Sequence, residues 1–230
     1  MSTRTQQLRL AVPAAVDGEV DAVVHRPGRR RGPAVLLLPG AGGDLGSEPL
    51  VALAEVVASC GHTVVRSNLA HHQAGRRAPR AETAVPVLRE VLEAAQQQLD
   101  EHAPWVLGGR SYGGRVASLA VAEGTDAAGL LFSGYPLHPP GRSDRLRVDH
   151  WPHVGVPCLF LQGDNDPMAD LELLDAHRHK LPRRSTLEVV RGGDHSLRVT
   201  AVRSPDGTPR SPAAAVQELR EPVCRWLAER

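Results

Sequence analysis

A serine between two glycines, at the end of an apolar segment, constrains this chain more than any other feature. Residues 105–108 predict a short buried strand, residues 109–113 read Gly-x-Ser-x-Gly, and residues 114–122 suit a helix. Glycines at 109 and 113 would let the strand and the helix approach closely around a sharp turn, which holds Ser111 up and exposed. The start of the helix also points free N–H groups at this position. The pattern predicts a nucleophilic serine. Because ordinary turns share this pattern, the assignment of Ser111 depends on partner residues elsewhere in the chain.

Two further side chains are predicted to lie at the same edge of a parallel sheet. Residues 157–162 predict a buried strand that ends in a turn containing Asp164 and Asp166, and residues 185–190 predict the next strand, which leads to His195. We therefore interpret Ser111, Asp166 and His195 as nucleophile, acid and base, in that chain order. Asp164 is the alternative acid; Asp166 is favoured because the following proline fixes its loop. An ordinary loop role is the alternative for His195.

A glycine-rich loop earlier in the chain predicts an oxyanion hole. Residues 33–38 form an apolar strand candidate that runs into residues 39–43, Pro-Gly-Ala-Gly-Gly. We expect the backbone N–H of Ala41, or alternatively of Gly42, to act together with that of Tyr112, and Gly40 and Gly42 to line the substrate site. A dinucleotide-binding turn is excluded because the loop lacks the Gly-x-Gly-x-x-Gly spacing. A phosphate-binding Gly-Lys-Ser motif is also missing.

Arg110 and the histidine pair at 71 and 72 have alternative interpretations. Arg110, beside the candidate nucleophile, either binds a carboxylate on the substrate or pairs with a nearby acidic side chain. His71 and His72 raise the question of a metal site, but adjacent histidines alternate sides in an extended chain and no carboxylate cluster lies near them in the sequence. We predict that they lie in a surface loop. The sequence indicates no metal site and no cofactor.

The remaining pattern predicts one α/β domain that covers residues 1–230. Strands alternate with helices, which is typical of a mostly parallel sheet covered by helices on both faces. The expected elements are an opening hairpin at 8–12 and 20–24, helices at 48–59 and 79–99, strands at 62–66 and 128–132, and a final helix at 212–229, with Pro222 as a candidate kink. Between residues 132 and 157 the chain is too short for a large cap domain, so we expect a shallow, open site.

Composition excludes several functional classes. The 27 basic and 26 acidic residues give a net charge of +1, and aromatic residues are only 3% of the chain, so we expect neither nucleic-acid nor membrane binding. The three cysteines are far apart and odd in number, which predicts reduced thiols and neither a disulfide framework nor a zinc site. No apolar leader or membrane-spanning run is found in the sequence, and we expect a cytoplasmic protein.

Four runs of sequence carry a resemblance to a known family. GGRSYGGRVAS, GYPLHPPGR, LFLQGDNDP and GGDHSL resemble small α/β-hydrolase-fold proteins of the testis-expressed and KANSL-type hydrolase-like group and, more distantly, dienelactone hydrolases. The resemblance covers nearly the whole chain. It implies a compact α/β-hydrolase fold without a cap, with Ser111, Asp166 and His195 as nucleophile, acid and base and with Gly40 and Ala41 in the oxyanion loop.

This chain departs from the related enzymes at two points. Serine stands where dienelactone hydrolases use cysteine, and Pro39 stands where many esterases have a histidine before the oxyanion glycine. We expect a serine hydrolase that cleaves a carboxylic ester, or a related acyl bond, of a small molecule through an acyl-enzyme. The alternative is a scaffold or partner-binding protein that keeps the fold without turnover. The oligomeric state is left open.

Overall fold

The computed structural model describes residues 3–230 and contains one eight-stranded sheet with the order β1-β2-β4-β3-β5-β6-β7-β8. β2 pairs antiparallel with β1 and with β4, and the pairs from β4 through to β8 are parallel. The strands are β1 (Arg4–Ala11), β2 (Glu19–Arg26), β3 (Val35–Leu38), β4 (Val64–Ser67), β5 (Val106–Arg110), β6 (Gly129–Ser133), β7 (Cys158–Gly163) and β8 (Ser185–Val190).

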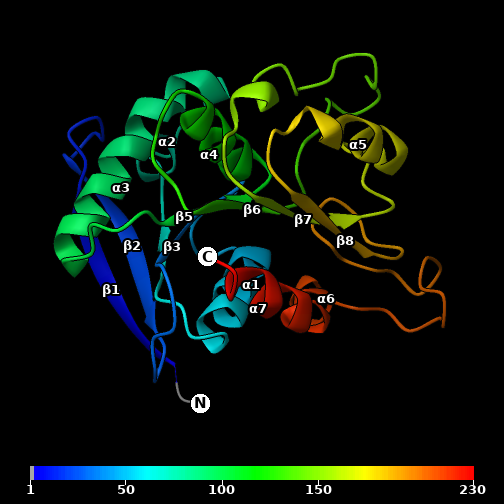
Figure 1. Cartoon of the computed structure of the whole chain (residues 1–230), viewed down its shortest axis with the longest axis horizontal. Helices are drawn as coiled ribbons and strands as arrows, with labels where there is room; N and C mark the ends of the chain where they lie inside the picture. Colours follow the sequence, from blue (N-terminus) through cyan, green and yellow to red (C-terminus); the bar gives the residue numbers. More distant parts are fainter. Residues whose placement is uncertain (1–2) are drawn as a thin grey trace.

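Helices cover both faces of the sheet (Figure 1). α3, α4 and α5 lie on one face, and α1, α6 and α7 lie on the other. The α-helices are α1 (Glu48–Ser59), α2 (Ala70–Gln73), α3 (Val85–Leu99), α4 (Tyr112–Ala122), α5 (Leu171–His177), α6 (Pro212–Glu218) and α7 (Arg220–Leu227), and the 3-10 turns are η1 (Ala81–Ala84), η2 (Trp151–His153) and η3 (Arg178–Lys180). Within residues 3–230, no helix combines the length and the apolar character needed to cross a bilayer.

The apolar core has two layers, one on each side of the sheet. In β3, Leu36 and Leu38 pack into the layer beneath α3 and α4, whereas Val35 and Leu37 pack into the layer beneath α1. All four side chains are fully buried. A parallel strand covered on both faces needs apolar residues at every position, which explains the continuous apolar runs in the sequence. The predicted mostly parallel sheet is confirmed.

Two predicted helices begin or end differently from the expectation. The segment predicted as one helix from residue 79 starts as η1 and becomes α helical only at Val85, with a proline in its first turn. The predicted final helix is two helices, which meet at Leu219. Pro222 lies in the first turn of α7, where its missing N–H leaves no hydrogen bond unmade. Pro222 therefore starts a second helix and does not kink a single long one.

The segment between β6 and β7 packs into the body of the protein. Tyr135 and Leu137 are fully buried, and Trp151 is nearly so. The Trp151 indole N–H donates to the Tyr135 hydroxyl at 3.2 Å, and that hydroxyl donates to the Arg147 carbonyl at 3.2 Å. Because these aromatic side chains fill the core beside α4, the segment forms no separate cap over the sheet edge, as predicted.

A disulfide overturns the prediction of reduced thiols. Cys60, at the end of α1, is bonded to Cys224 in α7, with 5.1 Å between their Cα atoms. Cys158 is a free, buried thiol in β7. The two bonded cysteines are 164 positions apart, and they meet because α1 and α7 lie on the same face of the sheet. Sequence spacing alone carries no signal for such a pair.

Candidate active site

Ser111 occupies a strained turn between β5 and α4. Its backbone angles are φ 47° and ψ −111°, a region that non-glycine residues rarely adopt. The Ser111 N–H donates to the Ser133 carbonyl at 3.0 Å, and the Ser111 carbonyl accepts from the Arg115 N–H at 3.0 Å. The turn is thus fastened to β6 on one side and to the first turn of α4 on the other.

Both glycines of the turn lie against the backbone of β3. A Cβ added to Gly109 would lie 2.0 Å from the Leu38 carbonyl oxygen, and one added to Gly113 would lie 2.4 Å from the same atom. Gly109 also has a φ of +138°, which disfavours any residue with a side chain. The glycines therefore permit the close approach of strand and helix that the sequence pattern predicts.

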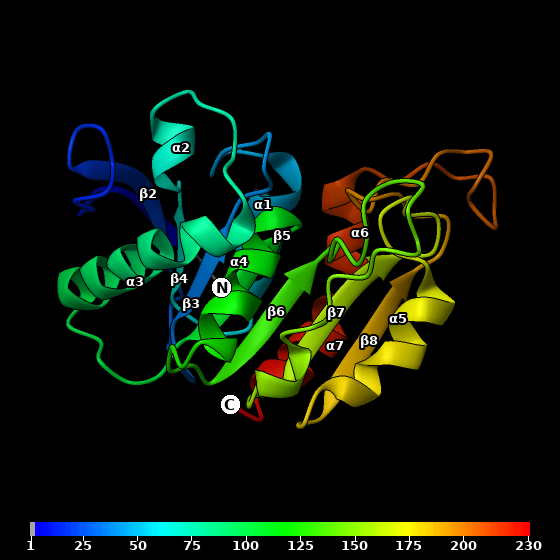
Figure 2. The same cartoon turned by 90° about the horizontal axis from the view of Figure 1, so that it is seen from above.

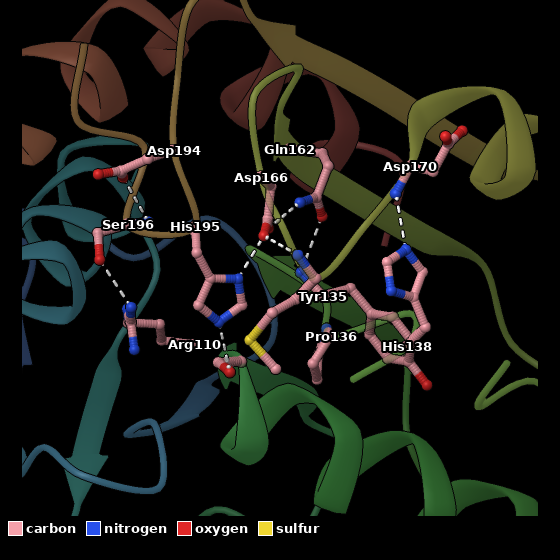
Figure 3. A network of polar contacts seen from close by, with 12 residues as sticks. Arg110, Tyr135, Pro136, His138, Gln162, Asp166, Asp170, Asp194, His195 and Ser196 are labelled. Atoms are coloured by element: carbon pink, nitrogen blue, oxygen red, sulfur yellow. Dashed lines mark hydrogen bonds and ion pairs between the residues drawn. The ribbon is translucent and has the colours of Figure 1, made fainter. Parts of the chain in front are cut away.

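Ser111, His195 and Asp166 form a continuous line of hydrogen bonds. His195 Nε2 lies 2.8 Å from Ser111 Oγ. On the other side of the ring, His195 Nδ1 lies 2.7 Å from Asp166 Oδ2 (Figure 3). With a carboxylate at Nδ1, the neutral imidazole carries its proton there and leaves Nε2 free to accept the serine proton. The Asp166 side chain is fully buried, while that of His195 is 17% exposed. Ser111 is 8% exposed, so it is more buried than the sequence pattern predicts.

Each member of this line comes from a loop at the carboxyl end of a parallel strand. Ser111 follows β5, Asp166 follows β7 and His195 follows β8. The strands from β5 to β8 are parallel neighbours, and Figure 2 shows β6, β7 and β8 running in the same direction, so these ends share one edge of the sheet. The topology explains how residues far apart in the sequence meet at this edge.

Asp166 is held by two further hydrogen bonds. Gln162 Nε2 donates to Asp166 Oδ2 at 2.6 Å, and the Met168 N–H donates to Asp166 Oδ1 at 2.7 Å. Gln162 in turn accepts the Tyr135 N–H at 2.8 Å (Figure 3). Gln162 is not among the site residues predicted from the sequence, although a polar residue at the end of an apolar strand is a usable signal. Asp164 accepts the Gly192 N–H at 2.6 Å, whereas His195 bonds to Asp166.

The glycine-rich loop after β3 lies directly beside the serine. A Cβ added to Gly40 would be 3.7 Å from the Ser111 Cβ, and the Gly43 N–H closes a turn on the Gly40 carbonyl at 3.2 Å. Among residues 3–230, no acceptor is bonded to the N–H of Ala41, Gly42 or Tyr112. These amides are open to a bound oxyanion, and both predicted alternatives at positions 41 and 42 stay open.

His72 contacts the glycine-rich loop, and nothing in the sequence indicates this contact. His71 and His72 lie in α2, and the prediction of a surface loop is wrong: His71 is buried against the ring of Tyr112, with 5.5 Å between the ring centroids. His72 Nε2 lies 2.9 Å from the Gly40 carbonyl oxygen. A helix of a single turn has no periodicity to read, so nothing in the sequence revealed this contact. No cluster of three or more potential metal ligands occurs in the described part of the chain.

Arg110 is hydrogen bonded at the edge of the site. Its Nη2 donates to Ser196 Oγ at 2.7 Å, and a Cβ on Gly40 would lie 2.5 Å from Nη1 (Figure 3). Burial lowers the pKa of Arg110, and the charges of Asp166 and Asp194 oppose that shift. In residues 3–230 no carboxylate lies within 4.0 Å of the guanidinium, so of the two interpretations of Arg110 the ion pair with a nearby acidic side chain is not found, and the guanidinium bonds to Ser196.

One protein family matches this chain in sequence, and several solved structures share its fold. The family described as alpha/beta hydrolase domain matches residues 31–222. An alpha-beta serine hydrolase homologue from Coxiella burnetii is 18% identical, with a TM-score of 0.72 and 97% of each chain covered. Dienelactone hydrolase from Anabaena variabilis is 16% identical, with a TM-score of 0.71 and coverage of 100% of this chain and 99% of that one. XC6422 from Xanthomonas campestris, a serine hydrolase without a lid, is 21% identical, with a TM-score of 0.67 and coverage of 99% and 97%.

Proposed function

The chain belongs to the alpha/beta hydrolase domain family, and on that basis we propose that it is a serine hydrolase that cleaves carboxylic esters through an acyl-enzyme. The observation that carries this proposal is the unbroken line from Ser111 Oγ through the His195 ring to Asp166, with distances of 2.8 Å and 2.7 Å. A hydroxyl, an imidazole and a buried carboxylate in this order form the constellation that activates a serine for attack on a carbonyl carbon.

In the proposed mechanism, His195 Nε2 takes the Ser111 proton as Oγ attacks the carbonyl carbon. The N–H groups of Ala41 and Tyr112 stabilise the oxyanion, and Asp166 stabilises the imidazolium and keeps the ring oriented. His195 then gives its proton to the departing alcohol, which leaves Ser111 acylated. A water molecule, deprotonated by His195, attacks the acyl-enzyme, and the acid product departs as Ser111 recovers its proton.

Arg110 has a proposed role in substrate binding. Its guanidinium lies over Gly40 beside the reacting serine and has no carboxylate within 4.0 Å in the described chain. We propose that Arg110, together with Gly40 and Gly42, forms one wall of the substrate site. The resemblance to the testis-expressed and KANSL-type group stays a prediction, and it suggests no particular substrate.

A scaffold without turnover is the alternative from another functional class. Such a protein has no need of a strained serine, and a φ of 47° at Ser111 has an energetic cost that selection for folding alone would remove. The two hydrogen bonds on Asp166 likewise favour an active hydrolase, because they serve to orient a carboxylate that has no other ionic partner than His195 in residues 3–230.

The test is hydrolysis of a panel of activated esters, thioesters and amides by the purified chain and by Ser111→Ala. We expect ester turnover that falls on the order of a millionfold in Ser111→Ala, as in other hydrolases of this kind. Ser59→Ala makes the same change at the far end of α1 and should retain the parent rate. Equal rates in the parent and in Ser111→Ala would contradict the proposal.

A further inference from the structure

The loop that carries the proposed oxyanion donor is held by residues from β4, from α2 and from the segment between them. Asn68 Oδ1 accepts the Leu45 N–H at 2.9 Å, and the buried Arg66 side chain donates to the Leu45 carbonyl. These contacts hold the far end of the loop at residues 40–46. His72 holds its near end, where Nε2 lies 2.9 Å from the Gly40 carbonyl oxygen.

The contact at Gly40 bears directly on the Ala41 N–H. The Gly40 carbonyl and the Ala41 N–H belong to the same peptide group, which is planar and trans, so they point in opposite directions. The carbonyl is directed at His72 and at the Gly43 N–H. Any rotation of this peptide plane would break the bond to His72 and would turn the Ala41 N–H at the same time. The direction of the Gly40 carbonyl thus fixes the direction of the Ala41 N–H.

The hydrogen bonds of His72 select one tautomer. The Gly40 carbonyl can only accept, so Nε2 must carry the proton, and Nδ1 then accepts the Leu69 N–H at 3.4 Å. Burial lowers the pKa of His72, which favours the neutral ring that this pair of contacts requires. The neighbouring His71 ring packs against that of His72, with 3.8 Å between centroids and an angle of 38° between the ring planes.

We propose that His72 is a positioning residue for the oxyanion hole: it locks the Gly40–Ala41 peptide so that the Ala41 N–H stays directed at the reacting carbonyl oxygen. This inference rests on the proposed function. Because His72 acts through the peptide group, its loss should lower the rate of the chemical step and leave substrate binding nearly unchanged.

The kinetic test compares three variants of the full chain with p-nitrophenyl acetate as the probe. In His72→Leu we expect kcat to fall about 10- to 100-fold with KM within about twofold, because the donor remains present but loses its direction. His72→Gln can place an amide N–H near the position of Nε2 and should recover most of kcat. His177→Leu removes another half-buried histidine that bonds a backbone carbonyl, far from the site, and should match the parent.

A second measurement does not depend on activity. Long-range ¹H–¹⁵N spectra of the parent protein near neutral pH report which nitrogen of a histidine carries the proton. We expect the Nε2–H tautomer for His72, and the Ala41 amide resonance should shift in His72→Leu more than in His177→Leu. An Nδ1–H tautomer would overturn the inference even if His72→Leu proved unable to fold.

The outcomes separate the two proposals. Hydrolysis that depends on Ser111 but keeps its kcat in His72→Leu would overturn the role of His72 and leave the proposed function intact. Equal losses in His72→Leu and His72→Gln would also overturn it, since a donor at that position would then have no effect. Absence of any hydrolysis that depends on Ser111 would overturn the proposed function, and the inference with it.

Discussion

At the scale of single residues, the turn around Ser111 depends on glycines that allow two backbones to meet. Gly113 is a helical residue, where alanine is ordinarily the better helix former. Its environment reverses that preference, because an added Cβ would lie 2.4 Å from the carbonyl oxygen of Leu38, a backbone atom in the middle of the sheet. The strand cannot move aside without disturbing the pairing of β3 with β4 and β5.

We therefore predict that Gly113→Ala destabilises the protein by about 3 kcal/mol or prevents folding, as expected for overpacking against a rigid neighbour. Gly155→Ala is the matched control, since nothing lies within 4 Å of its added Cβ, and it should change stability by less than about 0.5 kcal/mol. Urea unfolding of both variants provides the measurement. A Gly113→Ala protein as stable as the parent would show that the strand and helix are not in close contact.

At the scale of elements, a buried polar pair joins β2 to β4. Arg66 Nε donates to His25 Nε2 at 2.9 Å, and both side chains are buried. Burial, and secondarily the charge of Arg66, lowers the pKa of His25 to about 4. The folded protein therefore resists protonation of His25, whereas the unfolded chain takes up that proton near its ordinary pKa of 6.5.

The sign of the effect follows from this difference in proton uptake. Between about pH 6.5 and pH 4 the unfolded state binds more protons, so we expect stability to fall as the pH is lowered, by roughly 2 kcal/mol from His25 at pH 4.5. Urea midpoints measured from pH 4.5 to 7.5 should show a shallower dependence in His25→Gln, which keeps an acceptor for Arg66 but does not titrate. His71 and His150, with pKa values lowered mainly by burial to about 4, leave a remaining slope. An identical slope in the variant would contradict the assignment.

At the scale of the whole molecule, the disulfide closes most of the chain into one loop. Cys60 and Cys224 are separated by 164 positions and join α1, which follows the oxyanion loop, to the last helix. Cross-linking so long a loop removes more entropy from the unfolded chain than closing a short loop would. Disulfides persist mainly in oxidising compartments and are rare in the cytosol. The bond between Cys60 and Cys224 therefore does not support the expectation of a cytoplasmic protein. The location stays a prediction.

We predict that the double variant Cys60→Ser, Cys224→Ser loses about 2–5 kcal/mol of stability and keeps its ester turnover at moderate temperature. Turnover should persist because Ser111, His195 and Asp166 lie at the carboxyl ends of the strands, while the disulfide lies at the end of α1 that is remote from them. Thermal unfolding of the parent with and without a reductant provides an independent comparison. Equal stability in all of these forms would show that the bond does not form in solution.

The sequence predicts the fold at this scale well because its signals are local and repeated. Apolar runs mark each buried strand, and the chain order of Ser111, Asp166 and His195 places them at one sheet edge once the strands are parallel. Other features depend on contacts between distant elements. The disulfide needs α1 and α7 on the same face, and the His72 contact needs a single-turn helix beside the loop. Neither leaves a periodic pattern in the sequence.

The proposed activity requires above all that Ser111 be an activated nucleophile, which covalent labelling with a fluorophosphonate tests most directly. We predict that intact-mass analysis of the native protein shows a single adduct that maps to Ser111, and that both heat-denatured protein and His195→Ala react much more slowly. An adduct on another residue, or labelling of Ser111 at the same rate after denaturation, would contradict the account.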